Sequence, residues 1–347
     1  MNIIKNTGFY FLLLLPLLFS CQEGESEWLV PRDEVFDGGP GKDGIPAIDD
    51  PKFLDVSAVN FLDDQDLIVG FKSGNEIKGY PHDILDWHEI VNDKTNNIAY
   101  SVVYCPLTGS ATGWDRVING KETTFGVSGL LYNTNIIPYD RETDSNWSQM
   151  ELKCVNGKLA GSDPGNYLLI ETTWKTWKEL FPNSQVLSAN TGFNRRYGQY
   201  PYGSYRSDND LFFFPISNRD DRLPAKDRVY GIVVNDNSKA FPFSNFLTGL
   251  SVVEDEVGGI PVVVVGDAER NFVVGFERMT EDGSMLNFSA LSGEGTNIMT
   301  DNEGNTWDLF GYATSGPRTG ERLRIVRGFI AYWFAWGTFF PDIEITN

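Results

Sequence analysis

Residues 98–116, IAYSVVYCPLTGSATGWDR, align without a gap with residues 260–278, IPVVVVGDAERNFVVGFER. The flanking sequences follow the same shift within a few residues. The recurring pairs include Asp140 and Asp301, and Trp147 and Trp307. A repeat of this length indicates a duplicated subdomain. We therefore expect an α+β, β-rich fold in which two tandem copies of a β-meander-plus-helix unit pack as one pseudo-symmetric body.

The repeat divides most of the chain into three segments. A first repeat unit, which would carry the functional site, covers residues 52–187, and a second unit, which would act as scaffold, covers residues 228–347. Residues 188–227 connect the two units and are too long for a plain connection, so we expect them to be functional or irregular. We call this connecting segment the strap.

Local patterns predict mostly strands. Short runs of β-branched and aromatic residues between turn formers predict strands at 66–71, 98–104, 123–127, 229–234, 260–265 and 271–276. Helical patterns are few, and the best are at residues 81–91, 173–181 and 329–339. The pairs Gly74-Asn75 and Asn119-Gly120 predict tight hairpin turns.

The N-terminus resembles that of an exported lipoprotein. Residues 1–20 have the features of a signal peptide and lead into Leu18-Phe19-Ser20-Cys21, which is similar to a bacterial lipobox. Cys21 would be acylated and would anchor the protein in the outer membrane of a Gram-negative bacterium; an uncleaved anchor is the alternative. The acidic residues 22–27 resemble a surface-export signal, so the protein would face the periplasm or the cell surface. Residues 21–51 predict a tether or irregular arm without regular elements.

The charge balance limits the partners. The chain has a formal net charge of −20 and no basic stripe. Such a chain repels phosphate backbones, which argues against nucleic acid as a partner. We expect a lipid bilayer, reached through acylated Cys21, and an unknown small ligand.

The two copies differ at the residues that could carry chemistry. Cys105 of the first copy corresponds to Asp267 of the second, and it lies where a predicted strand turns into a loop. Such a position can hold an accessible thiol. The chain has two histidines, and we favour His88 as its partner because His82 corresponds to Phe243. A protonated His88 would lower the pKa of the Cys105 thiol and produce a nucleophilic thiolate.

Several alternatives compete with this Cys105/His88 centre. Cys105 could be a small buried hydrophobic residue or could form a disulfide with Cys154, and His88 could be a satisfied core residue. A thiolate and an imidazole could also bind copper or zinc, although a closed site needs further ligands. The candidates to complete it are Cys154, Met150, His82, Glu89 and Asp93.

The strap holds a concentrated cationic and aromatic cluster. Its members are Arg195, Arg196, Tyr197, Tyr200, Tyr202, Tyr205 and Arg206. One interpretation is a lid in which Arg195 and Tyr197 meet an anionic or planar ligand by charge and stacking. The other is an ordered covering strap whose tyrosine rings fill gaps.

Four motifs resemble the signature of the bacterial and archaeal domain-of-unknown-function family 3179. They are WHEIVND at 87–93, YCPLTGSA at 104–111, FGVSGLLYNTN at 125–135, and YDR at 139–141 with WSQ at 147–149. The resemblance extends from about residue 42 to the C-terminus. It implies an exported or lipid-anchored protein and specifies no activity. Many relatives have a second cysteine where this chain has Thr108, so a dithiol pair is absent here.

The resemblance implies which residues line or support the site. By position they are Glu89 and Asn92 beside the Cys105/His88 centre, together with Ser110, Ser128, Tyr132, Asn133, Asp140, Arg141, Ser148 and Gln149. Our first hypothesis is a thiolate-dependent enzyme or a copper-type metal site. The alternative is a non-catalytic ligand-binding or envelope-interaction module in which the motif residues hold the fold, since dense polar groups often form a structural network.

Overall fold

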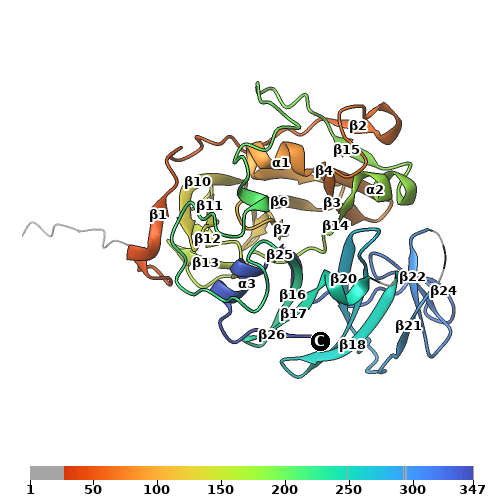
Figure 1. Ribbon diagram of the computed structural model, residues 1–347. Helices are drawn as coiled ribbons and strands as arrows, with labels where there is room; N and C mark the ends of the chain where they lie inside the picture. Colours follow the sequence, from red (N-terminus) through yellow and green to blue (C-terminus); the bar gives the residue numbers. More distant parts are fainter. Residues whose placement is uncertain (1–26, 248, 292, 294, 347) are drawn as a thin grey trace, which may run out of the picture.

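The computed structural model describes residues 27–247, 249–291, 293 and 295–346, and Figure 1 shows their arrangement. These residues form short strands and three short α-helices, which are α1 (His82–His88), α2 (Trp174–Leu180) and α3 (Trp333–Phe339). The four 3-10 helices among them are η1 (Arg32–Glu34), η2 (Val56–Ala58), η3 (Tyr205–Ser207) and η4 (Phe243–Phe246). The predicted β-rich α+β class is confirmed.

Strands β1 to β15 precede the strap and strands β16 to β26 follow it. The first set is β1 (Val35–Asp37), β2 (Phe53–Asp55), β3 (Leu67–Ser73), β4 (Glu76–Pro81), β5 (Ile90–Lys94), β6 (Ala99–Cys105), β7 (Ser110–Asp115), β8 (Val117–Ile118), β9 (Lys121–Glu122), β10 (Phe125–Tyr132), β11 (Asn135–Asp140), β12 (Asn146–Ser148), β13 (Lys153–Asn156), β14 (Ile170–Thr173) and β15 (Gln185–Leu187). The second set is β16 (Arg228–Val234), β17 (Asn237–Pro242), β18 (Ser251–Val257), β19 (Ile260–Asp267), β20 (Phe272–Glu277), β21 (Phe288–Ala290), β22 (Asn297–Asp301), β23 (Thr306–Asp308), β24 (Ala313–Ser315), β25 (Gly328–Tyr332) and β26 (Glu344–Ile345).

Each half contains a sheet in which a helix connects two of the strands, β14 to β15 in the first half and β25 to β26 in the second. The orders are β14-β3-β4-β15-β2 in the first half and β25-β16-β17-β26 in the second. In both sheets the strand before the helix pairs antiparallel and the strand after it pairs parallel. The helices carry Trp177 and Trp336, which lie directly over Gly70 and Gly231 of the sheets. Glycine is required at both positions because a Cβ atom would collide with the indole ring.

The remaining strands also follow a matching order. The meanders β5-β6-β7 and β18-β19-β20 are three-stranded, and they are followed by β10-β11-β12-β13 and β21-β22-β23-β24. Buried side chains of both halves share one core, since Trp147 of the first half belongs to the same cluster as Trp333 and Trp336 of the second. Tyr332 of β25 also donates its backbone N–H to Thr108 at 2.8 Å. Figure 1 shows β25 beside β7.

The N-terminal arm differs from the expected tether. Residues 35–37 form β1, which pairs with β10, and Ile48 is buried and hydrogen-bonds to the edge of β5. The folded part therefore begins before residue 52. The composition of the arm predicted irregular backbone, but its buried residues Val35, Ala47 and Ile48 supply enough burial to fix it on the sheet.

Two helices begin or end differently from the prediction. The helix expected at 81–91 ends at His88, because Glu89 adopts φ 59° and the chain continues as β5 from Ile90. The helix expected at 329–339 begins only at Trp333, after strand β25. The helix at 173–181 is confirmed as α2, which the Thr173 side chain caps by accepting from the N–H of Thr176.

The strap runs over the surface of the first half, where it crosses in front of β6 in Figure 1. Its backbone is held by side chains of the turn between β10 and β11. The Asn133 side chain accepts from the N–H of Ser217 at 2.8 Å, and the Thr134 hydroxyl donates to Phe214 at 3.1 Å. Among the described residues no helix is long and apolar enough to cross a membrane.

Candidate functional site

Cys105 lies at the end of β6 and is fully buried. Its thiol donates to the carbonyl oxygen of Thr134 at 3.8 Å, and burial raises its pKa to about 11. Cys154 is also buried and free, so the alternative of a disulfide between the two is wrong. The environment of Cys105 therefore favours the thiol over the thiolate.

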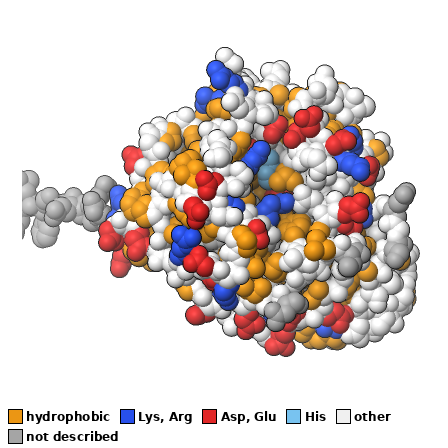
Figure 2. Space-filling model, viewed as in Figure 1, with side chains coloured by type: hydrophobic (Ala, Val, Ile, Leu, Met, Phe, Trp, Pro, Cys, Tyr) orange, Lys and Arg blue, Asp and Glu red, His pale blue; other side chains and the backbone are white. Residues whose placement is uncertain are grey.

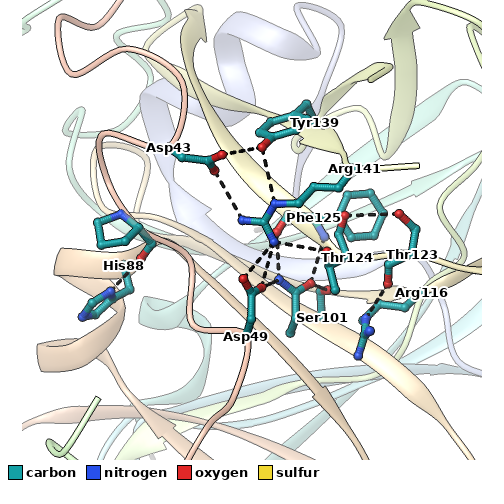
Figure 3. Close-up of polar contacts among 12 residues, drawn as sticks. Asp43, Asp49, His88, Ser101, Arg116, Thr123, Thr124, Phe125, Tyr139 and Arg141 are labelled. Atoms are coloured by element: carbon teal, nitrogen blue, oxygen red, sulfur yellow. Dashed lines mark hydrogen bonds and ion pairs between the residues drawn. The ribbon is translucent and has the colours of Figure 1, made fainter. Parts of the chain in front are cut away.

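His88, the last residue of α1, has both ring nitrogens occupied. Nδ1 lies 2.7 Å from the carbonyl oxygen of Pro46, and Nε2 lies 2.7 Å from the hydroxyl of Tyr197. Since a carbonyl only accepts, Nδ1 carries the proton and Nε2 accepts from Tyr197. Burial lowers the pKa of His88, which also favours the neutral ring. Figure 3 shows His88 directed toward the N-terminal arm.

The structure therefore does not join Cys105 and His88 by a hydrogen bond within the described part of the chain. A metal site is equally unsupported by these residues. In residues 27–346, outside the three undescribed internal positions, no group of three or more His, Cys, Asp or Glu side chains could hold a metal ion. The donor set present does not fit copper or zinc.

Asn92 of β5 is a buried structural crosslink. Its amide nitrogen donates to Asp49 Oδ1 at 2.7 Å and to the carbonyl oxygen of Phe125 at 2.8 Å. Its amide oxygen accepts from the Ser101 hydroxyl at 2.6 Å and from the N–H of Phe125 at 2.9 Å. Every hydrogen-bonding direction of Asn92 is used, which connects β5 to β6, β10 and the N-terminal arm.

Arg141 binds the N-terminal arm to the end of β11. Its guanidinium contacts Asp49 at 2.9 Å and Asp43 at 3.3 Å, and Tyr139 donates to the same Asp43 carboxylate. Figure 3 shows these side chains converging from the arm and from the strand. The Arg141 guanidinium is thus paired with carboxylates of the protein itself. Its role in this structure is to hold the arm against the end of β11.

Gln149 and Ser110 belong to a second buried network. The Ser110 hydroxyl donates to Gln149 Oε1 at 2.8 Å, and Asn135 donates to the same oxygen at 2.7 Å. The Gln149 amide nitrogen donates to the carbonyls of Val103 and Ser110 at 2.8 and 3.0 Å. Thr108, which replaces the second cysteine of many relatives, completes the network through Ser110 and Asn135.

The other predicted residues also hold backbone or core. Asp140 accepts from Trp147 Nε1 at 3.1 Å, as Asp301 accepts from Trp307 Nε1 at 2.8 Å in the second half. The remaining contacts are those of Ser128 with Ile137 at the bulge in β10, Tyr132 with the ring of Phe339, Asn133 with Ser217, and Arg195 with the ring of Trp87.

Glu89 is the predicted site residue that lines a mainly apolar pocket. The pocket has a cavity volume of about 70 Å³, several times what one water molecule needs. Its other lining residues are mostly apolar and come from the arm, β5, the β6–β7 loop, β10, β11 and the strap: Gly38, Pro40, Ile45, Ile90, Leu107, Val127, Gly129, Leu130, Leu131, Ile136, Ile137, Pro138, Tyr202 and Phe214. We call this cavity the Glu89 pocket.

The Glu89 carboxyl is the unusual group in this pocket. Glu89 is 4% exposed, and its Oε2 atom has no hydrogen-bond partner. Burial alone raises its pKa to about 8, so it is largely protonated at neutral pH. The backbone at Glu89 has φ 59° and ψ −36°, a conformation that costs a non-glycine residue about 1–3 kcal/mol. Such strain is typical of functional positions.

Sequence reasoning missed a second polar group on α1. The sequence comparison set His82 aside because it corresponds to Phe243, but its Nε2 lies 3.4 Å from Glu171 Oε2. Asp86, which was not singled out, is 3% exposed. The signal available was the spacing of His82 and Asp86 by four residues, which places both side chains on one helix face.

The fold and the Glu89 pocket define a β-rich α+β protein with a buried carboxyl facing an apolar cavity. The family described as protein of unknown function (DUF3179) matches residues 42–343, so the chain belongs to this family. No curated protein and no solved structure matches the chain significantly.

Proposed function

We propose that the protein is a non-catalytic binding protein for a small apolar molecule that carries a hydrogen-bond acceptor, such as a carbonyl group. The observation that carries the proposal is the buried Glu89 carboxyl, whose Oε2 atom has no partner and which lines an otherwise apolar pocket. A protonated carboxyl in such a place is a donor that lacks an acceptor. Leaving it unpaired costs about 1–3 kcal/mol, which a ligand acceptor would offset.

The backbone and side chains around Glu89 support a binding site that is already formed without a ligand. The strained backbone of Glu89 is held by its own N–H, which bonds to Leu85 at 2.8 Å, and by its carbonyl, which accepts from Tyr104 at 2.7 Å. Tyr202 and Phe214 of the strap form one wall. The lining of this small cavity has the character of a ligand pocket, being apolar with few polar groups that could fix orientation.

In this proposal the Cys105/His88 motif is structural. Both nitrogens of His88 bond to other groups, and the pKa of Cys105 is raised, which is the opposite of what a thiolate-dependent enzyme needs. The polar motif residues use their hydrogen bonds within the protein. The first hypothesis, an enzyme or a copper-type centre, would require these contacts to rearrange.

We further propose that the two halves arose by duplication and pack as a pseudo-symmetric pair, with units at 52–187 and 228–347 joined by the strap at 188–227. The matching strand orders support this, as do the equivalent contacts of Trp177 with Gly70 and of Trp336 with Gly231. Superposition of the two units tests it, and unmatched strand paths would contradict it.

We also propose lipid anchoring through Cys21 in the outer membrane, facing the periplasm or the cell surface. The support is the lipobox-like sequence, which lies outside the described residues. Incorporation of a palmitate analogue by the intact chain tests the proposal. Labelling that persists in Cys21→Ser would contradict it.

The binding proposal is tested with 4-fluoroacetophenone, followed by its ¹⁹F NMR signal during titration. We expect saturable binding at pH 6.5 that weakens as the pH rises above about 8, because the carboxylate cannot donate to a carbonyl. Glu89→Gln keeps a donor and should bind without this pH dependence. Glu89→Leu should weaken binding about 5-fold, because it removes one hydrogen bond to the ligand.

The matched control probe is 4-fluorotoluene, which has no acceptor. It should bind the protein and Glu89→Leu with similar affinity. Absence of saturable binding of 4-fluoroacetophenone, or binding that Glu89→Leu leaves unchanged, would contradict the proposal.

A further inference from the structure

A large groove lies between α2 of the first half and the second half. It has a cavity volume of about 1030 Å³ and is lined by Lys175 and Glu179 of the helix, by Leu250, and by Asp267 and Arg270 around the turn between β19 and β20. Figure 1 shows α2 above β20 and β22. We call this cavity the α2 groove. Small-molecule pockets have volumes of about 300–1,000 Å³, so the α2 groove has room for a longer ligand.

In the first half, the strap covers a surface built from the same kinds of elements. The Tyr200 hydroxyl of the strap donates to the carbonyl oxygen of Pro106, in the turn between β6 and β7, at 3.0 Å. The Asn218 side chain donates to the carbonyl oxygen of Gly337 in α3 at 2.8 Å. The strap also bonds to His88 at the end of α1. It therefore lies over a meander turn, a helix end and the helix of the other half.

Each of these contact positions has a counterpart in the α2 groove. The alignment of the two copies places Leu250 at the position of His88, and it places the turn after Asp267 at the position of the turn after Cys105. Helix α2 corresponds to α3, because each connects an antiparallel strand of its sheet to a parallel one. The lining of the α2 groove thus matches the surface under the strap.

The two turns also bind the facing half in similar ways. The carbonyl of Thr108 accepts from the backbone N–H of Tyr332, the residue before α3, at 2.8 Å. The carbonyl of Arg270, which aligns with Thr108, accepts from the hydroxyl of Thr172, two residues before α2, at 2.6 Å. The two places therefore match in their contacts as well as in sequence. The strap covers the first of them, and the second is the open α2 groove.

The α2 groove carries an excess of negative charge. Glu179, Asp267 and Glu269 line it, and among the described residues none of these carboxylates forms an ion pair. The cations in the lining are Lys175 and Arg270, and the Arg270 guanidinium donates to a carbonyl of the groove's own rim at 2.9 Å. Figure 2 shows acidic and basic side chains together over α2. A basic ligand would complete the charge balance of the groove.

We propose that the α2 groove binds an extended segment of a partner protein that carries basic and tyrosine residues, in the place that the strap takes on the first half. The contacts of the strap indicate the chemistry, since tyrosine and amide side chains bond there to backbone carbonyls. The net charge of −20 attracts a basic partner from solution. The choice of occupant rests on the proposed duplication. It does not depend on the Glu89 pocket.

The probe is a fluorescently labelled synthetic peptide with the sequence of residues 195–206, RRYGQYPYGSYR. We would titrate it with the full chain and follow its fluorescence anisotropy. We expect saturable binding that weakens as salt is added, because exposed charges are screened. A peptide with glutamine in place of every arginine should bind at least about 5-fold more weakly.

The test variant combines Glu179→Gln with Glu269→Gln, because both side chains are exposed and the fold should tolerate the change. It should weaken peptide binding about 5-fold, as expected for two exposed ion pairs. The matched control combines Asp236→Asn with Glu256→Gln, which removes the same charge from exposed positions of the second half outside the groove. The control should bind like the unaltered protein.

Absence of saturable binding would overturn the proposal. Binding that the test variant retains in full would also overturn it, since the peptide would then bind elsewhere, for example by displacing the strap. An equal loss in the test and control variants would show that only the net charge attracts the peptide. Unmatched strand paths on superposition of the two units would contradict the duplication, whereas this titration decides on the groove itself.

Discussion

The thiol of Cys105 has the properties of a core residue, and Cys154 provides the matched control. Both are buried, and burial raises their pKa values to about 11 and about 12. We predict that neither reacts measurably with iodoacetamide at pH 8 in the native protein and that both react in denaturant. Mass spectrometry of the alkylated protein measures this. Rapid labelling of Cys105 in the native protein, at a rate whose pH dependence has its midpoint below pH 8, would restore the thiolate hypothesis.

Glu89 should make the stability of the protein depend on pH. Its pKa is 4.5 in its ordinary state and about 8 in the folded protein, so the folded state retains a proton that the unfolded state releases. Stability from this group is fully present below pH 4.5 and is lost as the pH rises toward 8. In Glu89→Gln this loss disappears, so the variant should gain in Tm over the unaltered protein between pH 5 and pH 9. Parallel Tm profiles would contradict the assignment.

At the scale of elements, Asn92 holds β5 against its neighbours. Asn92→Ala removes four hydrogen bonds and leaves buried backbone groups of Phe125 unpaired, so we predict a loss of about 2–4 kcal/mol in the free energy of unfolding. Ser101→Ala, which removes one of the four, should cost about 1 kcal/mol. Urea denaturation measures both. Equal effects of the two variants would show that Asn92 is no crosslink.

The longer central strands and α2 could be predicted from their residues, and some of the exceptions have physical causes. The runs of β-branched and aromatic residues at 229–234 and 260–265 predicted β16 and β19, and the Gly-containing turns were confirmed between β3 and β4 and between β8 and β9. The end of α1 could not be predicted, because Glu89 adopts a backbone that its residue type disfavours. The partners of His88 come from the arm and the strap, far away in sequence.

The candidate site, too, could be predicted from the sequence only in part. The motifs located Asn92, Ser110 and Gln149 among buried polar residues, but residue types alone could not show that their hydrogen bonds are all used internally. The pairing of Cys105 with His88 rested on their chemistry, and the tertiary packing gives each a different partner. Glu89 was expected beside a thiolate, whereas the apolar wall around it is contributed by six separate segments.

At the scale of the whole molecule, the two halves should respond alike to equivalent changes. A Cβ atom at Gly70 would lie 2.0 Å from Trp177, and one at Gly231 would lie 2.4 Å from Trp336. We predict that Gly70→Ala and Gly231→Ala each cost at least about 1–3 kcal/mol of stability through overpacking. Replacing the facing Trp by Phe should recover part of each loss. Calorimetry measures both, and a neutral effect at one position alone would argue against equivalent halves.

The shared core makes the molecule one cooperative body, in which the strap and the N-terminal arm cover the first half. Tyr202 and Phe214 of the strap and Ile45 of the arm all line the Glu89 pocket. The pocket therefore exists only when segments between residues 38 and 214 are in place, while the second half supports it through the core around Trp333 and Trp336.

The central claim is that Glu89, and not the Cys105/His88 pair, determines what the protein does. The most direct measurement compares the affinity for 4-fluoroacetophenone of Cys105→Ala, His88→Gln and Glu89→Leu, each checked for native folding by circular dichroism. We predict that the first two stay within about 2-fold of the unaltered protein and that Glu89→Leu binds about 5-fold more weakly. Loss of binding in Cys105→Ala with full binding in Glu89→Leu would contradict the account.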